Sequence, residues 1–104
     1  MKKLICLLAT LIVANLAIAQ GDAEIGKEKA FTCMGCHGQD GIRNAYPAYR
    51  VPRLGGQGAE YIAIALRAYR SGERSHPTMQ GHAASLNDQD IENIGAYFAS
   101  IQND

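Results

Sequence analysis

The sequence predicts an all-α domain with long loops, and three observations support this fold class. The chain has 104 residues, which is enough for one small domain. Two segments, 59–71 and 87–101, carry apolar residues at the spacing of an amphipathic helix. No segment shows a convincing strand pattern. We therefore expect one helical domain rather than a mixed α and β fold.

Two helices are predicted in the first two thirds of the chain. The first spans about residues 23–32, where Asp22 can cap the first free amides. The second spans about residues 59–71 and is ended by Gly72 as a C-terminal cap. Its apolar stripe consists of Tyr61, Ile62, Ala65, Leu66 and Tyr69.

The last helix is predicted to begin after Asn87, which forms a shortened capping box with Asp90. Its apolar face consists of Ile91, Ile94, Phe98 and Ile101. The segments 38–58 and 73–85 are expected to be loops. Loops of such length in a small domain usually surround a ligand.

The N-terminal residues differ from the rest of the chain. Lys2 and Lys3 precede an almost wholly apolar run, Leu4–Ala19, which ends in the small-x-small pattern that signal peptidase reads. The run is shorter than the roughly 20 residues that a membrane-spanning helix needs. We therefore expect residues 1–19 to be a signal peptide cleaved after Ala19, and residues 20–104 to form a single domain. Cys6 would leave with the leader.

Residues 33–37 read Cys-Met-Gly-Cys-His, and several kinds of site could use them. A zinc site would need further ligands, and His76 and His82 are six residues apart, which is an awkward spacing. A thioredoxin-like pair normally follows a strand in a βαβ unit, which is not visible here. A disulfide between Cys33 and Cys36 would close a very small loop and restrict the unfolded chain little.

Covalent haem attachment accounts for every residue of this motif. One helical turn between the two thiols points both sulfurs at a single porphyrin, and His37 can offer its imidazole as the proximal iron ligand. Export agrees with this prediction, because c-type haem is attached outside the cytoplasm. The sequence therefore predicts one haem c with its iron, bound through Cys33 and Cys36.

The second axial ligand decides whether the haem is closed or open to small molecules. The candidates are His76, Met79 and His82, all in the predicted loop 73–85. A thioether is a soft ligand that raises the reduction potential, whereas a second imidazole lowers it. Met79 is favoured because it lies in a polar stretch without apolar periodicity, so a core-filling role is not indicated. Each histidine could equally be a solvated surface residue.

Three blocks, in this order, resemble class I c-type cytochromes, in particular the small bacterial group of cytochromes c4, c5 and c553. The blocks are "GDAEIGKEKAFTCMGCHGQDG", "PRLGGQGAEYIAIALRAYRSGER" and "MQGHAASLNDQDIENIGAYFAS". They cover essentially all of the chain after the leader. The resemblance implies a small cytochrome c fold, in which the N- and C-terminal helices cross and long loops surround one covalently bound haem.

The resemblance also implies roles for individual residues. The implied haem-binding set is Cys33, Cys36, His37, Pro52, Leu54, Leu66 and Met79. His37 and Met79 would ligate the iron, and the carbonyl of Pro52 would accept the Nδ1–H of His37. Leu54 and Leu66 would form walls of the haem site.

Two more positions follow from the same resemblance. Gly26 would let the first and last helices cross closely, near Gly95 and Tyr97. His82 stands where relatives often have an apolar residue, commonly a second methionine, so it remains a rival to Met79 as the axial ligand.

The expected function is that of a soluble periplasmic one-electron carrier. No constellation of acid, base and nucleophile is visible, so catalysis is not expected. The first alternative is a five-coordinate haem enzyme or gas sensor, in which Met79 would be easily displaced. The second alternative is a haem subunit of a larger oxidoreductase.

The expected partners are redox proteins that donate or accept electrons. The chain has ten Lys and Arg against ten Asp and Glu, and it would lose Lys2 and Lys3 with the leader. This balance argues against nucleic acid, which requires a basic face. Stable membrane insertion is not expected after the leader is removed, and the oligomeric state stays open. Arginines that could steer an acidic partner are Arg43, Arg50, Arg53, Arg67, Arg70 and Arg74.

Overall fold

The computed structural model describes residues 21–43 and 51–102, and the regular elements in these two ranges are all helical. They are α2 (Ala23–Lys29), η2 (Ala30–Cys33), α3 (Met34–His37), η3 (Gln39–Gly41), α4 (Ala59–Ser71), α5 (Pro77–Ala84) and α6 (Asp88–Ser100). The all-α prediction is confirmed. The predicted signal peptide and Arg50 lie outside the described residues.

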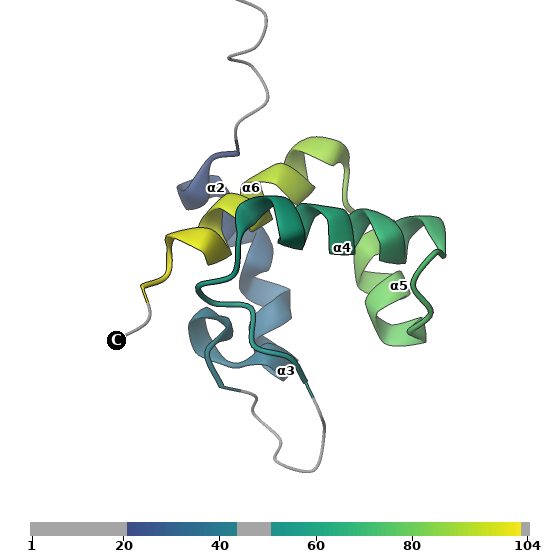
Figure 1. Cartoon of the computed structure of the whole chain (residues 1–104), viewed down its shortest axis with the longest axis horizontal. Coiled ribbons are helices and arrows are strands. Elements are labelled where there is room, and N and C mark those ends of the chain that lie inside the picture. Colours follow the sequence, from purple (N-terminus) through teal and green to yellow (C-terminus); the bar gives the residue numbers. More distant parts are fainter. Residues whose placement is uncertain (1–20, 44–50, 103–104) are drawn as a thin grey trace, which may run out of the picture.

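The first and last helices cross at a glycine, as expected (Figure 1). The carboxylate of Asp22 caps α2 by accepting from the amides of Glu24 and Ile25. Where α2 meets α6, a Cβ atom on Gly26 would lie 1.9 Å from the carbonyl oxygen of Asn93. The side chain of Asn93 in turn accepts from the amide of Asp22 at 2.7 Å. Only a residue without a side chain fits at Gly26, because backbone atoms of α6 occupy that space.

Gly95 serves a different crossing from the one expected. The nearest neighbours of Gly26 on α6 belong to Asn93 and Tyr97, whereas Gly95 lies against the start of α4. A Cβ atom on Gly95 would be 2.6 Å from the carbonyl oxygen of Ala59. The C-terminal helix therefore carries two close helix contacts on two of its faces, which makes α6 the centre of the fold.

The buried stripe of α4 differs in part from the predicted one. Ile62 and Leu66 are buried as expected, but the third buried residue of the helix is Ala63. Tyr61 is 54% exposed. Helical periodicity identifies an apolar face only approximately, and the position of α6 beside Ala59 selects the face that contains Ala63. The common core consists of Ala30, Ile62, Ala63, Leu66, Ile91, Ile94, Tyr97 and Phe98.

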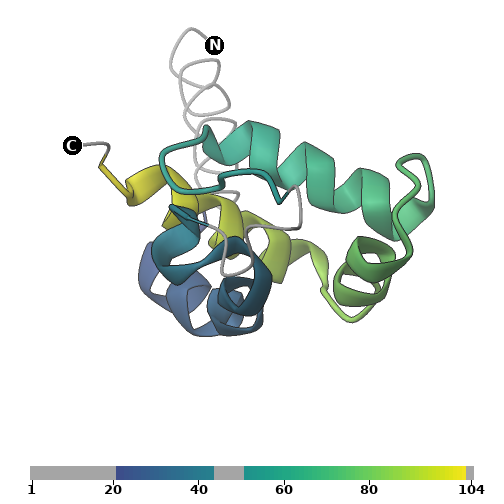
Figure 2. The same ribbon diagram turned by 90° about the horizontal axis from the view of Figure 1, so that it is seen from below.

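The prediction of a loop over residues 73–85 is wrong, because most of this segment is helix α5. Pro77 occupies the first turn, and the side chain of His76 accepts from the backbone amide of Met79, capping the helix. The sequence does not reveal this helix, because α5 buries only Ala83 and so has no apolar stripe. Met79 and His82 consequently lie on a helix. Figures 1 and 2 both show α5 packed beside the end of α4, at the other end of the molecule from α2.

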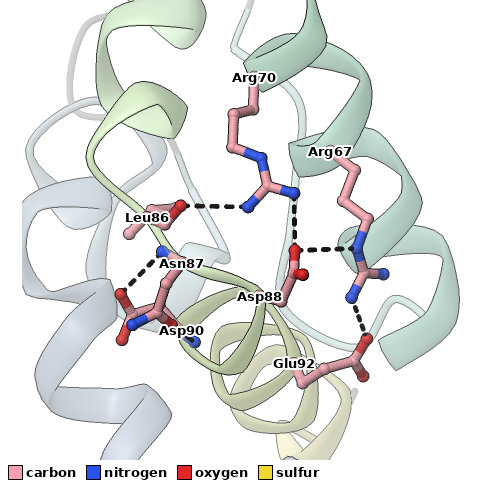
Figure 3. A network of polar contacts seen from close by, with 7 residues as sticks. All are labelled: Arg67, Arg70, Leu86, Asn87, Asp88, Asp90 and Glu92. Atoms are coloured by element: carbon pink, nitrogen blue, oxygen red, sulfur yellow. Dashed lines mark hydrogen bonds and ion pairs between the residues drawn. The ribbon is translucent and has the colours of Figure 1, made fainter.

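A network of charged side chains joins α4 to α6 (Figure 3). Asp88 lies between two guanidinium groups, at 2.6 Å from Arg70 and 3.8 Å from Arg67. Arg67 also contacts Glu92 at 2.6 Å. Hydrogen bonding to Arg70 is the main reason why the pKa of Asp88 is lowered. These two arginines are therefore engaged within the fold, which weakens their predicted role in steering a partner.

The helices of the described residues are all too short or too polar to cross a membrane.

Candidate haem site

The Cys-Met-Gly-Cys-His motif lies on two consecutive helical turns. Cys33 ends η2, and Cys36 and His37 belong to α3, so the two thiols are one turn apart. Cys33 is partly buried and Cys36 is exposed, whereas His37 is only 6% exposed. Gly38 then ends α3 with a φ of 84°, a conformation that favours glycine. The local backbone thus presents two thiols near the surface and buries the imidazole behind them.

The imidazole of His37 is held in one orientation by the backbone of a distant segment. Its Nδ1–H donates to the carbonyl oxygen of Pro52 at 2.7 Å. This is the contact that the family resemblance implies, and it leaves Nε2 as the nitrogen that could coordinate a metal. Burial lowers the pKa of His37, with the Pro52 carbonyl opposing this effect and the charge of His82 adding to it. The lowered pKa favours the neutral imidazole, which is the form that binds a metal.

The turn after His37 is tied to α6 by a short hydrogen bond. The hydroxyl of Tyr97 donates to the carboxylate of Asp40 at 2.5 Å. Asp40 has a φ of 56°, in the left-handed region that aspartate tolerates better than most residues. Burial and the neighbouring Asp40 raise the pKa of Tyr97 to about 12. Sequence reasoning did not assign a role to this pair; its one local signal is an aspartate between two glycines in "GQDG".

The same turn binds the segment that carries Pro52. The carbonyl oxygen of Gly41 accepts from the amide of Leu54 at 2.8 Å and from the amide of Gly55 at 3.0 Å. These bonds bring residues 52–55 against residues 38–41 across a long connection. The hydrogen bond between His37 and Pro52 is therefore supported by neighbouring backbone contacts.

Apolar side chains around this region pack against the common core. Leu66 belongs to the core itself, and the partly buried side chains against it are those of Cys33, Met34, Leu54, Met79, Leu86 and Ile101. The structure thus places the predicted wall residues and Met79 around one apolar cluster. His76 and His82 are both exposed, and Nδ1 of His76 is engaged with the amide of Met79.

The alternatives to haem fit this geometry poorly. The described residues contain no group of three or more His, Cys, Asp or Glu side chains that could hold a metal ion. A zinc site built from the two cysteines, His76 and His82 would require such a group. Burial raises the pKa of the Cys33 thiol, whereas a redox-active thiol needs a lowered pKa. Two thiols one turn apart, a neutral oriented imidazole and an apolar surround fit haem c.

Comparisons with known proteins agree with this site. The family model of cytochrome c matches residues 23–102. Cytochrome c4 of Pseudomonas aeruginosa is 44% identical over 99 residues, which cover 95% of this chain and 48% of that protein. Cytochrome c-554(548) of Halomonas halodenitrificans is 42% identical over 83 residues, covering 77% of this chain and 96% of that protein.

A solved structure and a more distant relative extend the comparison. The reduced cytochrome c4 of Pseudomonas stutzeri superimposes with a TM-score of 0.66 at 32% identity, covering 82% of this chain and 52% of that chain. The cytochrome subunit of sulfide dehydrogenase from Chlorobaculum tepidum is 32% identical over 76 residues, covering 73% of this chain and 66% of that protein. The chain spans about half the length of the cytochromes c4 that it matches. The match to the family model, the similarity to cytochromes c4 in sequence and fold, and the haem motif together show the family. The chain belongs to the cytochrome c family and is a class I c-type cytochrome of the c4 group.

Proposed function

We propose that this domain is a periplasmic one-electron carrier with a single haem c. Cys33 and Cys36 would form the two thioether bonds, and His37 and Met79 would be the axial ligands. A bound haem would supply an iron that cycles between the ferric and ferrous states. The observation that carries this proposal is the buried imidazole of His37, which the Pro52 carbonyl orients at 2.7 Å.

The protein's own residues would hold the cofactor and set its properties. The hydrogen bond from His37 to Pro52 would fix the tautomer and increase the basicity of Nε2. Leu54 and Leu66 would contribute to an apolar wall that keeps water away from the iron. The thioether of Met79 would favour the ferrous state and raise the reduction potential relative to a second imidazole.

Two observations support Met79 over the histidines as the second axial ligand. Met79 is partly buried against the core cluster, whereas His76 and His82 are exposed. In addition, Nδ1 of His76 accepts from the amide of Met79, which uses its lone pair and places the proton of a neutral ring on Nε2. His82 lies one turn beyond Met79 on α5, and its charge affects His37, so it remains the residue to test against Met79.

An absorption spectrum of the purified protein tests the proposal, recorded oxidised and reduced, with and without carbon monoxide. We expect a low-spin c-type spectrum that carbon monoxide does not change, because both axial positions are filled. Replacing Met79 by Ala should make the reduced protein bind carbon monoxide. A wild-type spectrum that shifts with carbon monoxide would contradict the carrier and favour a five-coordinate enzyme or sensor.

The proposed location follows from the predicted leader. Export would remove residues 1–19, and the mature protein would begin at Gln20. N-terminal sequencing of protein from a periplasmic extract tests this, and the first residue should be Gln20. A sequence that begins at Met1 or within Leu4–Ala19 would contradict cleavage after Ala19.

A haem subunit of a sulfur-compound dehydrogenase is the second candidate. The similarity to a cytochrome subunit of sulfide dehydrogenase favours it. Size exclusion of the native extract separates the two candidates, because a subunit elutes together with a dehydrogenase and a free carrier elutes apart from it. Both candidates use the same axial ligands.

A further inference from the structure

We propose that His76 is a positioning residue for Met79, and that the last turn of α4 holds helix α5 at both of its ends. His76 would thereby determine how firmly the sulfur of Met79 stays on the iron. The effect on the bond between Met79 and the iron rests on the proposed function. The capping and the restraint of α5 rest on the structure alone.

The first observation is the hydrogen bonding of His76 at the start of α5. Its Nδ1 accepts from the backbone amide of Met79 at 3.3 Å, and its carbonyl oxygen accepts from the amide of Gln80 at 2.8 Å. The bond from Gln80 is the first regular bond of the helix, whereas the amide of Met79 is one of those that a helix N-terminus leaves free. His76 therefore satisfies a free amide that belongs to the residue proposed to bind the iron.

The second observation is a stack of side chains that holds the His76 ring. The rings of His76 and Tyr69 form a T-shaped pair, with centroids 6.5 Å apart and planes at 76°. The guanidinium group of Arg74 lies 4.6 Å from the centroid of the same Tyr69 ring. The amide of Arg74 donates to the carbonyl oxygen of Ala68 at 3.1 Å, which turns the chain back over α4. The ring of the capping residue is thus fixed against α4.

The third observation concerns the other end of α5. Arg70, next to Tyr69 on α4, donates to the carbonyl oxygen of Leu86 at 3.2 Å (Figure 3). The same arginine is paired with Asp88 at the start of α6. Adjacent residues of α4 therefore restrain the segments before and after α5.

These contacts matter because α5 has little apolar burial of its own. Ala83 is its one buried residue. A helix with so little buried apolar surface opens locally more easily than the core helices. Its position then depends on its cap and its end contacts, and the position of Met79 depends on the same contacts.

Two substitutions of His76 test the proposal in the haem-loaded protein. His76→Asn keeps a side-chain oxygen that can cap the amide of Met79 but has no imidazole, whereas His76→Ala removes the cap. Thr78→Ala is the matched control, because Thr78 is an exposed residue in the same turn. The two measurements are the hydrogen-exchange rate of the Met79 amide and the rate of carbon monoxide binding to the reduced protein.

We expect His76→Ala to raise both rates by about fivefold, from the usual loss of an N-cap. His76→Asn keeps the cap and loses the contact with Tyr69, so it should raise both rates less than His76→Ala does. Thr78→Ala should leave both rates within about twofold of the wild type. Equal exchange in all variants would overturn the capping role. Faster exchange in His76→Ala without faster carbon monoxide binding would overturn the link to the iron. Loss of the low-spin spectrum in both His76 variants would show that the imidazole itself is a ligand, and would also overturn the proposal.

The proposed function fails separately from this inference. If the wild-type protein already binds carbon monoxide rapidly, Met79 is not a firm ligand. The exchange rate of the Met79 amide still decides whether His76 caps α5.

Discussion

The two sides of the proposed haem site are built differently. On the His37 side, residues 37–41 are tied to residues 52–55 and to α6 by backbone hydrogen bonds and by the Tyr97–Asp40 bond. On the Met79 side, α5 buries one residue and is restrained mainly by polar contacts at its ends. The imidazole is therefore buried within a closely bonded part of the fold, whereas the thioether is on a helix with little buried surface of its own.

Two glycines, one where α2 crosses α6 and one on α5, provide the largest contrast. Gly26→Ala would place a methyl group 1.9 Å from the backbone of Asn93, so α2 and α6 must separate. We expect a loss of about 3 kcal/mol or more in the free energy of unfolding of the holoprotein, because overpacking against backbone cannot be relieved by a rotamer change. Urea denaturation followed by circular dichroism measures this loss.

Gly81→Ala on α5 is the matched substitution. No atom lies within 4 Å of a Cβ atom placed there, and alanine favours a helix interior over glycine by about 1 kcal/mol. We expect unchanged or slightly increased stability. Similar losses in the two variants would show that α5 is packed as closely as the crossing of α2 and α6.

The hydrogen bond between Tyr97 and Asp40 provides the second test. Tyr97→Phe would leave the partly buried carboxylate without this donor, so we expect a loss of about 1–3 kcal/mol at neutral pH. The pKa of Tyr97 is raised from 10.0 to about 12, so its contribution is complete below pH 10 and is lost as the pH rises towards 12. The stability difference between wild type and variant should therefore narrow over this range in urea titrations. A constant difference from pH 9 to 12 would argue against the bond.

The charged network between α4 and α6 should give the smallest effect. Asp88→Asn removes the carboxylate between Arg67 and Arg70, on an exposed surface. We expect a slight decrease of the melting temperature at low ionic strength that disappears in high salt, because exposed ion pairs are screened. The pKa of Asp88 is lowered, so its contribution is present at neutral pH and is lost as the pH falls through the lowered pKa. Glu73→Gln, which removes another exposed carboxylate, serves as the control.

Local sequence determined most of the helix boundaries. Asp22, Gly72 and Asn87 are found at the predicted helix ends, because capping depends on side chains within three residues of the end. The spacing of Cys33, Cys36 and His37 likewise needs only one helical turn, so the haem prediction follows from the motif. Helix α5 was missed because its sequence has no apolar periodicity. Its one local signal is Pro77 in the first turn, directly after the capping residue His76.

Only the tertiary structure decided which faces meet. It buried Ala63 in place of Tyr61, paired Gly95 with Ala59, and brought Asp40 to Tyr97 across 57 positions of the chain. It also showed that the Nδ1 of His76 is engaged with the amide of Met79. The physical reason is that caps and motifs are local interactions encoded by neighbouring residues. Helix crossings and long-range hydrogen bonds instead depend on how all the apolar faces are buried together.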